Sequence, residues 1–202
     1  MTDSATREEE RKKRIIAATL ERIASSGLDN VTMQSIARTA GLSKGGLTHY
    51  YSSKQELFLE AFTDLFDKIV TECKTHSDSY DRPIDKLLSF DMIFRIDHPL
   101  LKMAHPILHN FMSVAAHDRL YQDIFHTWVE AWLDLIREIL EEGVADNSFS
   151  CHDIDFTART ISALIQGIAT RCFLAPQTHP TQWAMLAYHE VILKLLGFSD
   201  PR

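Results

Sequence analysis

One segment, residues 31–58 (VTMQSIARTAGLSKGGLTHYYSSKQELF), constrains the fold more than any other part of the chain. Its apolar spacing predicts two short helices joined by a tight turn, over about residues 33–40 and 44–51, with a third helix beginning at Lys54. A unit of this kind can lay its second helix in the major groove of DNA. The segment therefore predicts a helix-turn-helix.

The ends of these helices carry local signals. Thr32 and Ser43 are suited to cap the first two helices. Gly41 lies between them and tolerates the positive φ that ends a helix. Ser53 and Glu56 form an S-x-x-E capping box for the third helix.

The second helix has an inward and an outward face. Leu47 and Tyr51, four residues apart, are expected to pack inward, which leaves its polar residues for DNA. Adjacent glycines at 45–46 cost roughly 1 kcal/mol each in a helix, so they indicate either a frayed helix end or a close approach of the backbone to DNA. The candidate DNA contacts are Thr32, Gln34, Lys44, Gly46, Thr48, His49, Tyr50 and Lys54.

Residues 10–60 resemble the DNA-binding signature of the TetR family of transcriptional repressors. The resemblance is carried by Thr32, Ile36-Ala37, Ala40-Gly41-Leu42-Ser43, Leu47, Tyr51, Ser53-Lys54 and Leu57. It implies an all-α fold of about nine helices, and it favours a phosphate contact for Lys54. Gly46 and Thr48 differ from the residues that many members carry there, so the preferred DNA sequence does not carry over.

Charge is divided unevenly along the chain. Residues 1–54 contain nine Lys and Arg against six Asp and Glu, a net +3, whereas residues 55–202 contain twelve against twenty-two, a net −10. A local basic region is sufficient for DNA because phosphate neutralisation depends on nearby charges. No run of about 18 apolar residues and no apolar N-terminal segment is present, so we expect neither a membrane span nor a signal peptide. Three widely spaced cysteines fit a reducing, cytoplasmic location.

Helical periodicity continues through the rest of the chain, with no alternating strand pattern. Further helices are predicted over 8–26, 54–75, 100–117, 119–142, 154–174 and 181–196, with a short one starting at Pro83 and a loop over 143–153. We expect two domains: a helix-turn-helix DNA-binding domain at 1–53 and a ligand-binding and dimerisation domain at 54–202.

Aromatic and Met side chains are concentrated in residues 58–132. Their helical spacing predicts a core first, and some of them can also line an apolar cavity for a small molecule. The candidate ligand contacts are Phe62, Phe66, Phe94, His105, His109, Met112, Tyr121, Phe125, Trp128 and Arg171. His105 and His109 also have the i, i+4 spacing of a zinc pair. Because no third ligand stands at a useful spacing, we predict no metal. No G-x-S-x-G setting and no carboxylate pair stands out, so we predict no catalytic residue, and we expect no cofactor.

Residues 154–196 have the pattern of an interface. A strip of small residues recurs at spacings of three or four in the first of the two helices, and the second is apolar on most sides. The expected interface residues are Thr160, Ala163, Gly167, Thr170, Leu186 and Leu193. In the TetR family the last two helices form a four-helix dimer interface, and these two helices match them in position.

Together these features predict a ligand-responsive DNA-binding regulator and not an enzyme. We expect a homodimeric repressor that a small molecule releases from a palindromic operator, although an activator would have the same features. One alternative is an all-helical metal-binding or enzymatic protein that uses His105 and His109. Another is an interaction module that has lost DNA binding, against which Lys44, Lys54 and the basic run at 11–14 argue.

Overall fold

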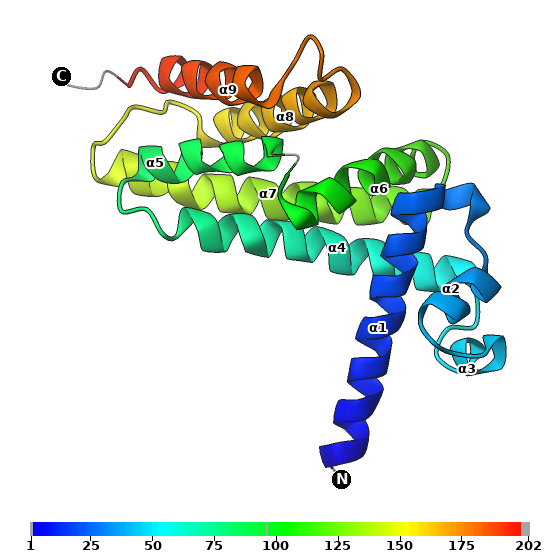
Figure 1. Ribbon diagram of the computed structural model, residues 1–202. Coiled ribbons are helices and arrows are strands. Elements are labelled where there is room, and N and C mark those ends of the chain that lie inside the picture. The colour runs from blue at the N-terminus through cyan, green and yellow to red at the C-terminus, as the bar shows by residue number, and fades with distance from the viewer. Residues whose placement is uncertain (1, 96, 199–202) are drawn as a thin grey trace. The chain divides into compact units, whose positions relative to one another are not determined.

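The computed structural model describes residues 2–95 and 97–198. Within these ranges the chain contains nine α-helices, two short 3₁₀ helices and no strand, which confirms the all-α fold (Figure 1). The α-helices are α1 Thr2–Ser26, α2 Met33–Thr39, α3 Lys44–Thr48, α4 Lys54–Ser77, α5 Pro83–Leu88, α6 Pro99–Ala115, α7 Arg119–Ala145, α8 Ile154–Leu174 and α9 Thr181–Leu195. The 3₁₀ helices are η1 Leu28–Asn30 and η2 Ser89–Phe94. No helix in the described ranges is long and apolar enough to cross a membrane.

Three expected boundaries are wrong. Helix α1 begins at Thr2 and not at residue 8. Helix α3 ends at Thr48 and not at Tyr51, because the N–H of Tyr50 bonds to the carbonyl of Leu47 and tightens the last turn (3.0 Å). Helix α7 continues past Gly143, where a loop was expected. The ring of Phe149 packs over this glycine so closely that a Cβ would lie 2.1 Å from it, so the glycine provides room within the helix and does not end it.

Packing divides the chain into two compact units. Unit 1 comprises Met1–Asp67 with Met103–His126, and unit 2 comprises Lys68–Lys102 with Thr127–Arg202. These units differ from the functional domains expected on either side of residue 53, because residues 54–67 and 103–126 pack with the N-terminal helices. The functional division stays a prediction.

The core of unit 1 is aromatic. Helix α2 packs against α1 and α3 (Figure 1). The ring of Phe111 lies 4.8 Å from those of both Phe62 and Phe66 and 5.9 Å from that of Tyr121. All four side chains are at most 5% exposed, and burial raises the pKa of Tyr121. These four rings form a buried aromatic cluster shared by α4, α6 and α7.

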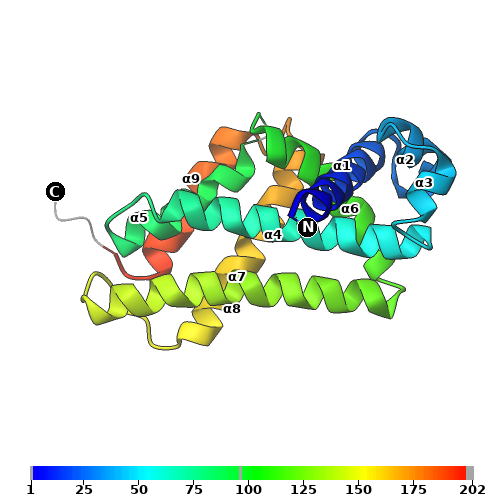
Figure 2. The same cartoon turned by 90° about the horizontal axis from the view of Figure 1, so that it is seen from below.

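Unit 2 is built around an antiparallel pair of helices, α8 and α9, which lie side by side in both views (Figures 1 and 2). Both pack against η2, and α9 also packs against α5. The fully buried Tyr188 of α9 donates a hydrogen bond to the carbonyl of Leu87 (2.8 Å), and its ring meets that of Phe94. Burial raises the pKa of Tyr188. These contacts bury one face of the helix pair and leave the other outside.

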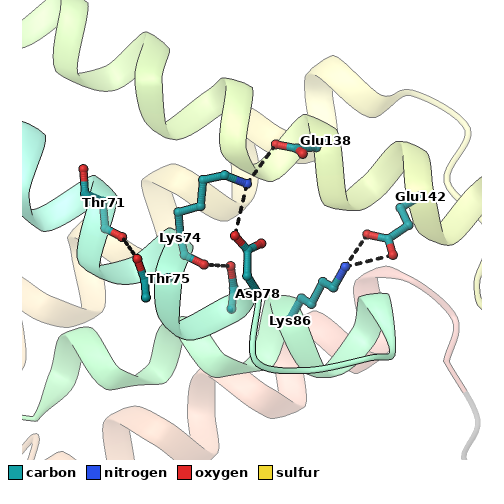
Figure 3. A network of polar contacts seen from close by, with 8 residues as sticks. Thr71, Lys74, Thr75, Asp78, Lys86, Glu138 and Glu142 are labelled. Atoms are coloured by element: carbon teal, nitrogen blue, oxygen red, sulfur yellow. Dashed lines mark hydrogen bonds and ion pairs between the residues drawn. The ribbon is translucent and has the colours of Figure 1, made fainter.

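Ion pairs add surface links within unit 2 (Figure 3). Lys74 of α4 lies 3.5 Å from carboxylates of both Asp78 and Glu138, and Lys86 of α5 pairs with Glu142 at 2.7 Å. These links join α4 and α5 to α7. Partly exposed pairs of this kind contribute little stability, so the buried contacts carry more of the energy.

Candidate DNA-binding site

The two helices of the helix-turn-helix are capped as the sequence predicts. Thr32 Oγ1 accepts a hydrogen bond from the Ser35 N–H (3.1 Å), and the Thr32 N–H donates to Ser35 Oγ (3.0 Å). Ser43 Oγ accepts from the Gly46 N–H (3.0 Å). Gly41 between the helices has a φ of 68°. Both ends of the turn are therefore specified by local chemistry.

The cap of α4 differs from the expected box in one bond. Ser53 Oγ accepts from the Glu56 N–H as predicted (3.1 Å). The Glu56 carboxylate, however, accepts from the hydroxyl and the N–H of Ser52 (2.6 and 2.8 Å), and not from Ser53. Ser52 offers two donors to one oxygen, and these bonds hold the pKa of Glu56 below its usual range.

The inward face of α3 is confirmed. Leu47 is fully buried and Tyr51 is 1% exposed. The Tyr51 hydroxyl donates to Glu60 Oε1 of α4 (2.9 Å), and burial is the main reason that the pKa of Tyr51 is raised. This face packs against the rest of unit 1, and the opposite face of α3 is turned to solvent.

The candidate contact residues differ in exposure. Thr32, Gln34, Lys44, Thr48 and His49 are exposed, and Gly46, Tyr50 and Lys54 are half-buried. Arg11 Nη1 of α1 lies within hydrogen-bond distance of the Tyr50 hydroxyl (3.5 Å), which raises the pKa of Arg11. The basic run that contains Arg11 is evident in the sequence, but its contact with Tyr50, 39 residues away, is not.

The two glycines of α3 have different surroundings. A Cβ on Gly46 would lie 3.3 Å from Ser43 Oγ, the atom that caps its own N–H. A Cβ on Gly45 would meet nothing nearer than 4.0 Å. Gly46 thus has a partial explanation within the chain, and a close approach of either glycine to DNA stays a prediction.

Lys54 is turned partly toward the protein. Its Nζ donates to the carbonyl of Leu28 (3.2 Å) and lies 5.0 Å from the centre of the Phe58 ring. An ammonium group has three donors, so one bond to Leu28 leaves capacity for a phosphate. The phosphate contact stays a prediction.

The candidate ligand residues fall into both units. Phe62, Phe66, His105, His109, Met112, Tyr121 and Phe125 belong to unit 1, and Phe94, Trp128 and Arg171 belong to unit 2. Phe62, Phe66 and Tyr121 meet around Phe111, whereas Arg171 is exposed. The ring packing supports a core, and a ligand role for these residues stays a prediction.

His105 and His109 do not form part of a larger donor cluster. His109 Nδ1 lies 2.7 Å from the carbonyl of His105, a hydrogen bond in which the ring nitrogen donates. Across residues 2–95 and 97–198, no group of three or more His, Cys, Asp or Glu side chains could hold a metal ion. The metal-binding alternative therefore has no supporting geometry in this part of the chain.

One face of α8 and α9 exposes apolar side chains. Phe156, Leu174 and Leu186 are 63–65% exposed, and a Cβ built on Gly167 meets nothing within 4 Å. Of the predicted interface residues, Ala163, Gly167 and Leu186 are exposed, and Thr160, Thr170 and Leu193 are half-buried. Phe156 and Leu174 were missed, although they extend the strip of small residues at the same spacing of four.

Comparison with known proteins connects both ends of the chain to one family. Residues 15–61 match the model of bacterial regulatory proteins of the tetR family. Residues 107–197 match the model of the BetI-type transcriptional repressor, C-terminal. The chain belongs to the TetR family. The expected family is thereby confirmed, and the two TetR-family models together span the helix-turn-helix and the exposed helix pair.

Relatives extend the same TetR-family similarity over most of the chain. The transcriptional regulator PksA of Bacillus subtilis is 27% identical over 83% of this chain and 81% of its own. The transcriptional repressor KstR2 of Mycolicibacterium smegmatis is 29% identical over 72% and 70%. A transcriptional regulator from Saccharomonospora viridis, solved in complex with choline, has the same fold with a TM-score of 0.82, 18% identity, and coverage of 91% and 96%. The protein is a DNA-binding transcriptional regulator and not an enzyme.

Proposed function

We propose that the protein is a homodimeric repressor that binds a palindromic operator and that a small molecule releases. The observation that carries the proposal is the pairing of a capped, outward-facing α3 with an exposed apolar face on α8 and α9. One surface reads DNA, and the other joins two copies. A two-fold axis between the copies requires two matching half-sites in the operator.

The DNA contacts divide into base reading and phosphate positioning. Lys44 and Thr48 are exposed on α3, and they are suited to a guanine edge and a thymine methyl group. Thr32, Gln34 and Tyr50 are suited to phosphates, with Arg11 beside the Tyr50 hydroxyl. Thr48→Ala should therefore change the preferred bases, at about 1–3 kcal/mol per lost contact.

The operator can be found by selecting bound duplexes from a random pool. We expect an inverted repeat, and an affinity whose logarithm falls linearly with the logarithm of salt concentration by about 0.9 per phosphate neutralised. Lys54→Ala should weaken all duplexes equally and reduce that slope. A slope near zero, or a selected site without two-fold symmetry, would contradict the proposal.

The dimer is proposed to form through the outer face of α8 and α9. Exposed apolar patches of this kind mark interaction surfaces, and the open space at Gly167 allows a partner helix to approach closely. Gly167→Trp should yield a monomer in sedimentation, because overpacking a close contact costs about 1–3 kcal/mol or more. Leu120→Trp, at a 50% exposed position on α7, is the matched control and should stay dimeric. An unchanged Gly167→Trp dimer would show that the interface lies elsewhere.

The effector is proposed to be a small organic molecule with an apolar part and a polar end. The aromatic content of residues 58–132 supports the apolar part, and the net −10 of residues 55–202 disfavours a polyanion. Choline, found in complex with the similar S. viridis regulator, is the first probe, and a neutral aromatic compound is the second. His105→Ala or Trp128→Ala should weaken release by the active probe without weakening operator binding. If the active probe releases both variants from the operator at the concentration that releases the parent protein, the effector binds elsewhere.

A further inference from the structure

Side chains from two other helices bind the backbone of one residue, Leu28, at the corner between α1 and α2. The carbonyl of Leu28 accepts a hydrogen bond from Lys54 Nζ at the start of α4 (3.2 Å). The N–H of the same residue donates to Asn110 Oδ1 of α6 (3.2 Å). All three residues belong to unit 1, although Asn110 is 82 positions from Leu28. We name this arrangement the Leu28 clamp.

The orientation of the Asn110 amide is determined by a second bond. Its Nδ2 donates to the carbonyl of Pro106, one turn earlier in α6 (2.7 Å). An amide that donates from nitrogen at one end presents its oxygen at the other, so Oδ1 is the atom that faces the Leu28 N–H. The Asn110 amide therefore has both its donor and its acceptor engaged.

The corner has a shape that fits this contact. Gly27, which precedes Leu28, has a φ of 74°, and a Cβ there would lie 3.6 Å from Asn110 Oδ1. Leu28 is 8% exposed, so its backbone N–H has little access to water. The first N–H groups of a helix have no partner within it, and η1 begins at Leu28. Asn110 supplies the acceptor that η1 lacks.

The clamp stands directly before the DNA-binding helices. Only Asp29, Asn30 and Val31 separate Leu28 from Thr32, the cap of α2. Helix α3 packs against α2, so its position depends on where α2 begins. We propose that Asn110 is a positioning residue for DNA binding. It acts through its hydrogen bond to the Leu28 N–H and does not itself contact DNA.

The test compares three variants. Asn110→Ala removes the acceptor for Leu28. Asn110→Asp keeps an oxygen acceptor for the Leu28 N–H in either orientation of the carboxylate, and it replaces the donor to Pro106 with a negative charge. Ser113→Ala changes an exposed α6 residue, one turn away, and is the surface control.

The first measurement is amide hydrogen exchange of Leu28 by NMR in the full-length protein. We expect faster exchange in Asn110→Ala and parental exchange in Asn110→Asp and Ser113→Ala. This measurement needs no DNA, so its result is independent of the palindromic operator proposed above. If the Leu28 amide exchanges at the parental rate in Asn110→Ala, Asn110 does not protect it and the Leu28 clamp is refuted.

The second measurement is affinity for the duplex selected from the random pool, over a salt series. We expect Asn110→Ala to bind about fivefold more weakly or worse, the equivalent of about one hydrogen bond. Its salt slope should equal that of the parent, because no phosphate contact is lost. Asn110→Asp should bind more tightly than Asn110→Ala, because it keeps an acceptor for the Leu28 N–H. Parental affinity in Asn110→Ala, or equal losses in Asn110→Ala and Asn110→Asp, would refute the positioning role.

Discussion

A substitution at Phe111 can show whether the aromatic cluster in unit 1 is a solid core or the wall of a ligand cavity. The Phe111 side chain is fully buried, and its ring lies 4.8 Å from the rings of Phe62 and Phe66 and 5.9 Å from that of Tyr121. In a solid core, Phe111→Ala should lower the free energy of unfolding by about 3–5 kcal/mol. Each aromatic pair lost contributes about 0.5–1.5 kcal/mol beyond its buried area. Phe111→Leu, which keeps much of the volume, should cost about 1–2 kcal/mol.

Urea unfolding at one fixed protein concentration measures these changes, since the stability of a dimer depends on its concentration. For a chain of this size, each kcal/mol should lower Tm by about 2–4 °C. Leu120→Ala, at a 50% exposed position in the same unit, is the control and should change stability by no more than about 0.5 kcal/mol. A cost below about 1 kcal/mol for Phe111→Ala would refute the core, because a ring that borders open space leaves little new cavity when it is removed.

Three further predictions follow from contacts that the structure describes. Gly143→Ala should lower the free energy of unfolding by about 1–3 kcal/mol, because the added Cβ would lie 2.1 Å from the Phe149 ring. In a protein that already carries Phe149→Ala, Gly143→Ala should add no further cost. Additive losses of the two changes in urea unfolding would contradict this. Glu56→Gln should make the free energy of unfolding depend less on pH in acid. Ser52 lowers the pKa of Glu56 in the folded state, so the Glu56 carboxylate stabilises the fold above about pH 4.3. That stabilisation is lost as pH falls through the folded pKa. Gly46→Val should abolish operator binding in gel shift while sedimentation still shows a dimer, and parental binding would remove close backbone approach as the reason for this glycine.

The parts of the fold that the sequence predicted depend on local chemistry. Thr32 and Ser43 cap helices through atoms three residues away, and Gly41 ends a helix through its own φ. Such features can be read from a short window. Leu47 and Tyr51 are both buried as expected: Tyr51 lies beyond the end of α3, but its N–H still bonds to the carbonyl of Leu47 four residues earlier (3.1 Å). For these elements, neighbouring residues contain all the necessary information.

The parts that were wrong or missed depend on distant residues. Gly143 was taken as the start of a loop, and only the position of Phe149 explains why a glycine stands inside α7. The bond from Asn110 to Leu28 spans 82 residues, and no spacing rule predicts it. Phe156 and Leu174 could have been found, since they continue the spacing of the small-residue strip. They were missed because large apolar side chains in a helix are more often core than interface.

The packing of unit 1 has a consequence for truncation. Residues from beyond position 53 belong to the same compact unit as the N-terminal helices: Leu57 and Phe62 of α4 and Phe111 of α6 are all fully buried, and Asn110 bonds to the corner before α2. A fragment of residues 1–53 would lack these buried parts of unit 1, and about 50 residues rarely bury enough surface to be stable alone. We therefore expect the fragment to give a poorly dispersed NMR spectrum and no cooperative thermal transition. A folded fragment that binds the selected operator half-site would show that residues 1–53 are a folding domain in their own right, and that the support from α4 and α6 adds stability without specifying the structure.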